Sequence, residues 1–364
     1  MDVLFDGKIW AMQRAGGINR YFANLISRLP EDCNPTLTTR QELGVNAPAH
    51  SHLRIKPYHP FRPHRISRLL EKAYFRSLER VHQYHVAHPT YYSLLTQQEF
   101  NCYRCPVVVT VYDMIHELFP QNLQTEDERN VWRQKKQAVE RADAILCISE
   151  NTRRDLIALY PQVEAKTVVT YLATEMDLSF TSGTQPVPER PYFLFVGGRS
   201  SYKNFDGLLT SLSQITPRYP DVLVCVVGSA FSEAEQNTIA SLGLTDHFLH
   251  YGSIDDRHLA KLYRHSLALV YPSRYEGFGI PPLEAMACET IVVGANVSSV
   301  PEVVGRAGLL FDPDSDELTD ILLALLAGAV DRGDFIQRGR QRAGDFHWDK
   351  TTAQTVAVYR KIAG

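Results

Sequence analysis

Two carboxylates in the C-terminal half of the sequence have a spacing that suits a sugar-phosphate site. Glu276 and Glu284 stand eight residues apart and flank the run Gly277-Phe278-Gly279. Glycines allow a backbone to approach a ligand closely, and carboxylates accept hydrogen bonds from sugar hydroxyls. We therefore interpret this stretch as a binding site for a sugar attached to a phosphate. The alternative is a charged loop before an ordinary helix.

A strand and a helix must position these carboxylates. The apolar run at residues 267–271 predicts a buried strand. Pro281 suits the first turn of a helix, so we expect a helix to begin near it. Glu276 then lies in the strand-to-helix loop and Glu284 in the first helical turn. The free N–H groups and partial positive charge at the start of that helix suit phosphate.

A second cluster carries two cations. Arg199 and Lys203 follow a predicted strand at residues 192–196, and Asn204 is placed to cap a helix that begins near Phe205. Their loop lies at the C-terminal end of a parallel strand, where doubly wound sheets bind ligands. Two cations there could neutralise a diphosphate; the alternative is a pair of surface cations.

At these residues the sequence resembles a known family. The string from Tyr271 to Ala287, with Glu-x7-Glu followed by Ala-Met-Ala, is similar to the signature of retaining nucleotide-sugar glycosyltransferases, in particular glycosyltransferase family 4. The resemblance covers nearly the whole chain and is strongest over residues 197–313. It implies two Rossmann-like domains facing across a cleft, the GT-B fold. The chain departs from many relatives at Glu289, where glycine is common.

The resemblance also implies roles for individual residues. Glu276, Arg199 and Lys203 would be catalytic, with Glu276 holding the donor sugar and the two cations holding the donor diphosphate. The other donor contacts would come from Gly17, Phe278 and Gly279 to the diphosphate, from Gly277 and Phe278 to the sugar, and from Glu284, Tyr251, Gly252 and Ile254 to the ribose and base.

Residues for the acceptor side follow from the same resemblance. Gly16 and Gly17 come after a predicted first strand at residues 3–5, and the family has a matching loop that faces the donor phosphates and the acceptor. Many relatives carry a His-Asp pair where this chain has Tyr112 and Asp113. The Tyr112 hydroxyl or the nearby His116 could replace the contact of that histidine. Packing is the alternative for Tyr112, and a helix cap is the alternative for Asp113.

Length and periodicity predict an α/β protein of two domains. Apolar strand-like runs alternate with helical patterns along the 364 residues, which argues for parallel sheets covered by helices on both faces. Residues 172–190 include a polar, proline-containing stretch and predict an interdomain linker. We expect an acceptor-side domain at 1–175 and a nucleotide-sugar-binding domain at 176–345. By resemblance, a last helix at about 346–364 crosses back onto the first domain.

Composition excludes several classes of function. Hydrophobic residues make up 44% and charged residues 22%, as in soluble globular proteins, and the net charge of -3 gives no basic field for nucleic acid. No apolar run approaches the roughly 18 residues of a transmembrane helix, and the first residues lack a signal peptide's basic start. Cys147 and Cys225 lie in apolar runs, which fits free thiols in a reducing compartment. We therefore expect a cytoplasmic protein without nucleic-acid partners.

No metal site is predicted. Cys102 and Cys105 form a lone CxxC without a second ligand pair at zinc spacing. His82, His85 and His88 recur every third residue, but they have no nearby carboxylate and a proline follows them. We assign no Asp-x-Asp pair to a metal. Cations and a helix dipole, rather than Mg²⁺, are expected to neutralise the donor phosphates.

Residues 53–80 are unusually basic, with eight Lys or Arg and two Glu. Apolar and small residues recur there at helical spacing: Ile66, Leu69, Leu70, Ala73, Ser77, Leu78 and Val81. A basic amphipathic helix can lie on an anionic membrane. The alternative is a surface helix that packs this apolar stripe on its own domain.

We interpret the chain as a retaining glycosyltransferase that moves a hexose, with mannose favoured, from a nucleoside diphosphate sugar to a hydroxyl acceptor. The acceptor would be a growing polysaccharide or a lipid-linked glycan. The donor, with GDP-sugar favoured, is a co-substrate, and no cofactor is expected. The protein would act in the cytoplasm, at the inner face of a membrane if residues 53–80 contact lipid. The alternatives are a nucleotide-sugar epimerase, a sugar phosphorylase on the same fold, or a non-catalytic nucleotide-sugar binding protein.

Overall fold

The computed structural model describes the chain except residues 14–15, 41–42, 45 and 123–124, and does not describe the side chains of residues 79–81 and 122. Part of the predicted glycine loop, and the side chains of Arg80 and Val81 in the basic segment, thus lie outside the described residues. The chain divides into two compact units. Unit 1 is Met1–Leu172 with Trp348–Gly364, and unit 2 is Ala173–His347.

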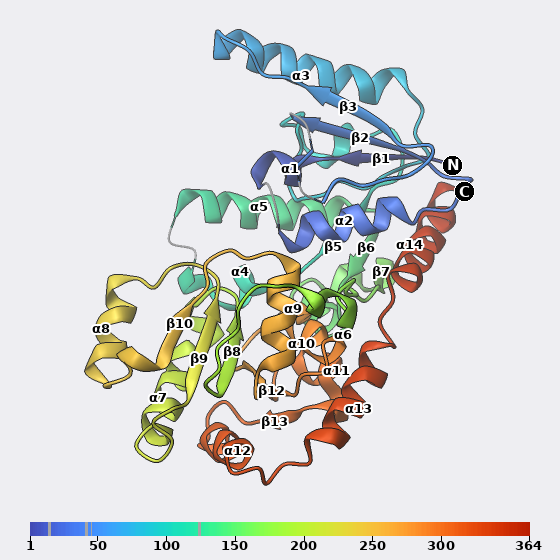
Figure 1. Cartoon of the computed structure of the whole chain (residues 1–364). Helices are drawn as coiled ribbons and strands as arrows, with labels where there is room; N and C mark the ends of the chain where they lie inside the picture. Colours follow the sequence, from blue (N-terminus) through green and yellow to red (C-terminus); the bar gives the residue numbers. More distant parts are fainter. Residues whose placement is uncertain (14–15, 41–42, 45, 123–124) are drawn as a thin grey trace. The chain divides into compact units, whose positions relative to one another are not determined.

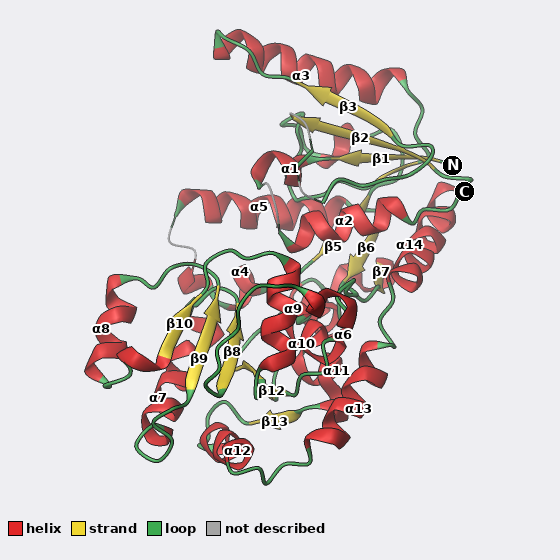
Figure 2. Cartoon of the chain, viewed as in Figure 1, coloured by secondary structure: helices red, strands yellow, loops and turns green. Residues whose placement is uncertain are grey.

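Unit 1 is built on parallel strands (Figures 1 and 2). The order is β3-β2-β1-β4, and a bridge between Ala87 and Val107 leads on to β5-β6-β7. The strands are β1 Asp2–Asp6, β2 Asn34–Arg40, β3 Arg54–Tyr58, β4 Val86–Ala87, β5 Val108–Val111, β6 Ala144–Cys147 and β7 Thr167–Val169. The helices are α1 Lys8–Met12, α2 Gly17–Ser27, α3 His64–Val81, α4 Ile115–Leu118, α5 Glu126–Arg141, α6 Glu150–Leu159 and α14 Trp348–Ala363.

Unit 2 contains one parallel sheet in the order β10-β9-β8-β11-β12-β13. The strands are β8 Tyr192–Val196, β9 Leu223–Val227, β10 Phe248–His250, β11 Leu269–Tyr271, β12 Val292–Ala295 and β13 Leu309–Phe311. The helices are α7 Phe205–Ile215, α8 Glu233–Ser241, α9 Asp256–His265, α10 Ile280–Ala287, α11 Val300–Val304, α12 Glu317–Leu326 and α13 Arg332–Ala343.

Helices cover both faces of the unit 2 sheet. Phe193 on one face shares a buried core with Leu208 of α7 and Leu322 of α12. On the other face, the Tyr192 hydroxyl donates to the Leu262 carbonyl of α9 at 2.8 Å. Parallel strands covered on both faces read as continuous apolar runs, which is why the sequence shows them so clearly. The predicted α/β class with parallel sheets is confirmed.

The last helix, α14, belongs to unit 1. The Thr351 hydroxyl donates to the Tyr171 carbonyl at 2.5 Å, and Tyr359 Oη lies 2.5 Å from His88 Nδ1. The segment after unit 2 therefore returns to the N-terminal unit, as the resemblance implied, and its helix begins at Trp348.

Helix α3 exposes most of the apolar stripe that one of our two interpretations would bury. Ser67, Glu71 and Phe75 are buried, whereas Ile66 is 52% exposed and Leu69 is 69% exposed. The interpretation that the apolar stripe packs on its own domain is therefore wrong. Across the parts of the chain that the structure describes, no helix combines the length and the apolar character that membrane crossing requires.

Candidate functional site

The order of the strands in the unit 2 sheet reverses between β8 and β11. These two strands are neighbours, and the strands that follow each of them lie further out on opposite sides. In doubly wound sheets, ligands bind beyond the carboxyl ends of the strands at this switch point. Lys203 follows β8 and Glu276 follows β11, so the fold brings together two residues that stand 73 positions apart.

Lys203 and Glu276 form an ion pair at the switch point. Lys203 Nζ donates to Glu276 Oε1 at 2.6 Å, and the two side chains are 18% and 10% exposed. The ammonium lies 5.8 Å from the centre of the Tyr271 ring. Burial raises the pKa of the Tyr271 hydroxyl, and the charge of Glu276 and a hydrogen bond to it raise this pKa further. Lys203 is thus not a free surface cation, and its charge acts where little water screens it.

Two serines fix the loop that carries Glu276. Ser298 Oγ accepts the Glu276 N–H at 3.1 Å and donates to the Glu276 carbonyl at 2.8 Å. Ser299 Oγ lies 2.9 Å from the Glu276 carbonyl oxygen and 2.8 Å from that of Phe278. Ser298 has a φ of 57°, a left-handed conformation that serine seldom adopts. Nothing in the sequence assigned the serines this role; the available signal was their place after the neighbouring strand.

Helix α10 begins directly after this loop. Gly279 occupies the N-cap position with a φ of 112°, a conformation that favours glycine, and Ile280 is the first helical residue. The N–H groups of a first helical turn have no partner within the helix and suit a phosphate. The predicted helix start near Pro281 is correct to within one residue. The loop thus presents Glu276 beside a helix N-terminus.

Glu284 is buried on α10 rather than lying in its first turn. That expectation is wrong, because the helix begins at Ile280 and its first turn contains no acidic residue. Glu284 is 5% exposed, and the Tyr263 hydroxyl donates to its Oε2 at 3.1 Å. Burial raises the pKa of Tyr263, and the charge of Glu284 raises it further, so Tyr263 remains a protonated donor. The ribose contact of Glu284 stays a prediction.

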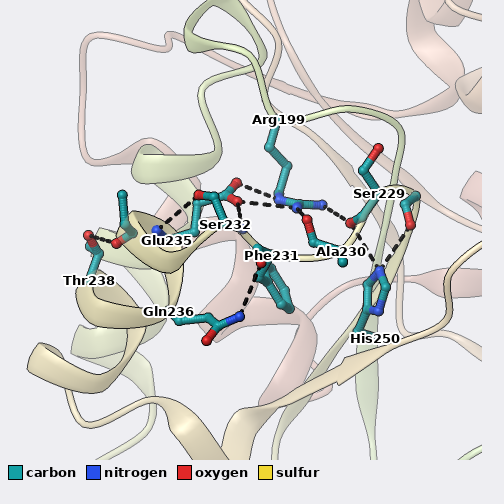
Figure 3. A network of polar contacts seen from close by, with 11 residues as sticks. Arg199, Ser229, Ala230, Phe231, Ser232, Glu235, Gln236, Thr238 and His250 are labelled. Carbon is teal, nitrogen blue, oxygen red and sulfur yellow. Dashed lines mark hydrogen bonds and ion pairs between the residues drawn. The ribbon is translucent and has the colours of Figure 1, made fainter.

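Arg199 takes no part in the ion pair at the switch point and has its own set of partners, which Figure 3 shows. Its Nε donates to Glu235 Oε1 at 2.6 Å, and its Nη1 and Nη2 donate to the carbonyls of Ser229 and Ala230 at 2.9 and 2.8 Å. The guanidinium carbon lies 4.5 Å from the centre of the Phe231 ring, and the side chain is 4% exposed. These contacts occupy most of the five N–H donors of Arg199, and its diphosphate role stays a prediction.

Glu235 links Arg199 to the start of α8. It forms a capping box with Ser232, whose N–H donates to Glu235 Oε2 at 2.6 Å. Burial would raise the pKa of Glu235, but the hydrogen bonds from Arg199 and Ser232 outweigh this effect and hold the pKa below its usual value. Arg199 therefore ties the loop after β8 to the loop and helix after β9.

The predicted base-binding segment follows β10. The Gly228 N–H donates to the Gly252 carbonyl at 3.2 Å, so the ends of β9 and β10 are joined. A Cβ on Gly197 or Gly252 would meet no atom within 4 Å, so both glycines border open space. Tyr251 and Ile254 are half-buried on either side of Gly252. Their contact with a base stays a prediction.

In unit 1, the predicted acceptor residues follow β1 and β5. Gly17 is the first residue of α2, with Gly16 before it. The Tyr112 hydroxyl donates to the Thr90 carbonyl at 3.3 Å, and the Tyr112 N–H donates to the Tyr92 hydroxyl at 3.3 Å. Protein contacts therefore hold Tyr112, which supports the packing alternative for this residue.

Asp113 and Glu117, which stand on either side of His116 in the sequence, contact a buried lysine. Asp113 Oδ1 accepts the Ile115 N–H at 3.0 Å, but the N-cap residue of α4 is Met114, so both the ligand role and the helix-cap role of Asp113 stay predictions. Lys135, whose side chain is 1% exposed, donates to the Asp113 carbonyl at 2.6 Å and to the Glu117 carboxylate at 2.8 Å. Within the described part of the chain, His116 Nδ1 and Glu117 Oε1 are buried without a hydrogen-bond partner. Such unsatisfied groups are uncommon, which singles out this spot in unit 1.

Among the described residues, no group of three or more His, Cys, Asp or Glu side chains is placed to hold a metal ion. The expectation that His82 and His85 have no nearby carboxylate is wrong, because the Asp2 carboxylate lies 3.8 and 3.5 Å from them. Asp312 and Asp314 have Asp-x-Asp spacing but are engaged within the protein. Asp312 Oδ1 accepts the Asp314 N–H at 2.9 Å, and Asp314 Oδ1 accepts Arg274 Nη1 at 2.6 Å. Cys102 and Cys105 are half-buried.

Comparison with known proteins identifies the family and the fold of this chain. Residues 15–177 match the family model described as Glycosyltransferase Family 4, and residues 182–342 match Glycosyl transferases group 1. The O-antigen chain mannosyltransferase B of Escherichia coli is 34% identical over 244 residues, which cover 62% of this chain and 62% of that protein. The chain thus spans less than two thirds of the length of this relative.

Two solved structures are similar over nearly the whole chain. Sucrose-phosphate synthase from Thermosynechococcus elongatus has a TM-score of 0.74 at 22% identity, covering 99% of this chain and 98% of that one. Anabaena HepE, solved with UDP and glucose, has a TM-score of 0.71 at 17% identity, covering 99% and 100%. With the family matches, these folds define a glycosyltransferase of the GT-B fold. The chain belongs to glycosyltransferase family 4.

Proposed function

We propose that this protein transfers a hexose, with retention of anomeric configuration, from a nucleoside diphosphate sugar to a hydroxyl of a glycan. The observation that carries the proposal is the ion pair of Lys203 and Glu276, which is largely shielded from solvent at the switch point of unit 2, with Glu276 in the loop directly before α10. A cation and a helix N-terminus match the diphosphate of such a donor, and a carboxylate matches its sugar hydroxyls.

The chemistry follows from these groups. When the bond between the anomeric carbon and the diphosphate oxygen breaks, the sugar gains oxocarbenium character and the diphosphate gains negative charge. Lys203 and the N–H groups at Phe278 and Gly279 stabilise that charge. Lys203 has three N–H donors, so it can keep Glu276 and also bind a phosphate oxygen. Glu276 holds the sugar hydroxyls while the acceptor oxygen bonds to the same face of the anomeric carbon, and the proton of the acceptor hydroxyl passes to the departing diphosphate oxygen.

The donor and acceptor are narrower proposals. The E. coli relative is named an O-antigen chain mannosyltransferase, which supports mannose as the sugar and a polysaccharide or lipid-linked glycan as the acceptor. We favour GDP as the nucleotide, although Anabaena HepE was solved with UDP, so both need testing. We place the reaction in the cytoplasm, at the inner face of a membrane where the acceptor is lipid-linked.

Thermal unfolding in the presence of GDP-, UDP- and dTDP-sugars tests the donor, because a ligand that binds the native state raises the melting temperature. Product analysis without an acceptor then separates the alternatives. An epimerase would convert the donor sugar, and a phosphorylase would need inorganic phosphate. A non-catalytic binding protein would be stabilised by a nucleotide sugar but would turn none over, with or without acceptor.

A further inference from the structure

Helix α3 of unit 1 presents an apolar strip to solvent. Ile66, Leu69 and Leu70 are 52%, 69% and 48% exposed, and Ala73 and Ser77 are also exposed. At about 100° per residue, these five positions fall within one arc of about 100° on the helix surface. The strip is therefore one continuous face and not a scatter of single apolar side chains.

The opposite face of α3 is anchored, so the strip cannot turn inward. Arg40 Nε and Nη2 donate to the Glu71 carboxylate at 2.8 and 2.7 Å. The Tyr58 hydroxyl donates to the Ser67 carbonyl at 2.7 Å, and the Tyr58 ring lies 6.2 Å from that of Phe75. These contacts fix the helix along β3, at the edge of its sheet (Figure 1).

Cations flank the strip on one side. Arg65, Arg68, Lys72 and Arg76 fall within an arc of about 80° directly beside Leu69. Arg65 and Arg68 are exposed, and the other two are half-buried. Arg40 neutralises Glu71, so that carboxylate does not cancel the cations of α3. The whole chain has a net charge of -3, so this positive charge is a local property of the face.

We infer that this face of α3 docks on an anionic lipid surface. Contiguous apolar strips on a soluble surface mark interaction sites, and an apolar strip with cations along its edge matches an acyl boundary below a layer of anionic headgroups. A lipid surface fits better than a second copy of the chain, because paired α3 helices would bring like charges together. Each cation near an anionic surface strengthens binding about fivefold.

The inference deepens the proposed function by naming a lipid partner, and it rests on that function only for the idea that the acceptor lies at the membrane. Vesicle binding is measured without donor or acceptor, so the two proposals can fail separately. Wild-type protein that binds vesicles but turns over no nucleotide sugar would sink the proposed function alone. Protein that turns over donor but ignores vesicles would sink the inference alone.

Co-sedimentation with phosphatidylcholine vesicles, with and without phosphatidylserine, tests the docking. We expect binding at least about tenfold stronger when phosphatidylserine is present, and weaker binding at high salt. The triple variant Ile66→Ser/Leu69→Ser/Leu70→Ser should lose at least about tenfold in binding, because the buried strip supplies the apolar part of the affinity. It should keep its melting temperature, since all three side chains are exposed.

A matched control is Leu159→Ser on α6, where the leucine is 42% exposed and far along the sequence from α3. This variant should bind vesicles as the wild type does. Arg65→Gln/Arg68→Gln/Lys72→Gln should remove the preference for phosphatidylserine. The inference is overturned if the apolar triple variant binds as well as the control. It is also overturned if light scattering shows a dimer that the triple variant abolishes while neither protein binds vesicles.

Discussion

Replacing Glu276 with glutamine removes a charge from the candidate site and changes its shape very little. Ser298 and Ser299 hold the backbone of Glu276 and not its carboxylate, so the loop should keep its geometry in Glu276→Gln. What is lost is a charged acceptor for the donor sugar hydroxyls, together with the ion pair to Lys203. Hydrogen bonds to charged groups contribute about 1.5–3 kcal/mol, so kcat/KM for transfer should fall by about tenfold to about 150-fold.

The same variant should not weaken affinity for free nucleoside diphosphate, because that ligand has no hexose for Glu276 to hold and Lys203 loses the carboxylate that competes for its charge. Glu284→Gln is the matched comparison: it should weaken nucleotide binding itself if Glu284 contacts the ribose. Calorimetric titration with the nucleoside diphosphate and steady-state transfer kinetics give both quantities. If Glu276→Gln weakened nucleoside diphosphate binding as much as Glu284→Gln did, the division between sugar and ribose would be wrong.

Four further outcomes follow from the same structure. Lys203→Ala should lower turnover at least about tenfold, or roughly 1.4 kcal/mol. It should also lower the melting temperature, because it leaves the buried Glu276 carboxylate unpaired. Wild-type turnover in the folded variant would reject the diphosphate role. Arg199→Ala should lower the free energy of unfolding in urea by about 1.5–3 kcal/mol, because Glu235 and two carbonyls lose their donor. It should slow turnover less than Lys203→Ala does. A larger loss of turnover would show that Arg199 binds the diphosphate. Transfer should continue in EDTA. If EDTA abolished transfer and Mn²⁺ or Mg²⁺ restored it, the expectation that the donor phosphates need no metal would be wrong. Burial lowers the pKa of His88 from 6.5 to about 3, so its contribution to stability is complete above the unfolded pKa and is lost as pH falls below it. The unfolding free energy at about pH 5 should therefore be about 2 kcal/mol lower than at neutral pH. His88→Gln should show less of this pH dependence.

The location of the site could be predicted from sequence, but its contacts could not. Lys203 and Glu276 each follow an apolar strand, and the carboxyl ends of parallel strands share one edge. Their direct pairing depends on β8 and β11 being neighbours, which is a property of strand order that local patterns do not contain. Arg199 stands close to Lys203 in sequence, but its direction is set by Glu235, 36 residues later.

The sequence also did not predict the backbone conformations of two residues beside helices. Asn204 does occupy the N-cap of α7, but with a φ of 52° and no side-chain hydrogen bond to the helix. Glu289, where relatives often carry glycine, has a φ of 58° after α10, a conformation in which glycine is unstrained. Ion pairs with Arg264 and Arg340 accompany Glu289 there.

Periodicity located the stripe on α3 without showing which face is buried. The strongly apolar face was the natural choice for packing. The structure instead buries Ser67, Glu71 and Phe75, because Arg40 and Tyr58 satisfy the polar groups on that side. Tertiary partners from other strands decide such cases, and the sequence of the helix alone does not contain them.

The central claim is that the site around Lys203 and Glu276 transfers a hexose from a nucleotide sugar with retention. The most direct measurement is to incubate the wild-type protein and Lys203→Ala with GDP-mannose and a glycan acceptor, and then to determine the anomeric configuration of the new linkage by NMR. UDP- and dTDP-sugars are run in parallel. We predict a product with the configuration of its donor, formed much more slowly by Lys203→Ala. An inverted product, or no product from any of these nucleotide sugars, would contradict the account.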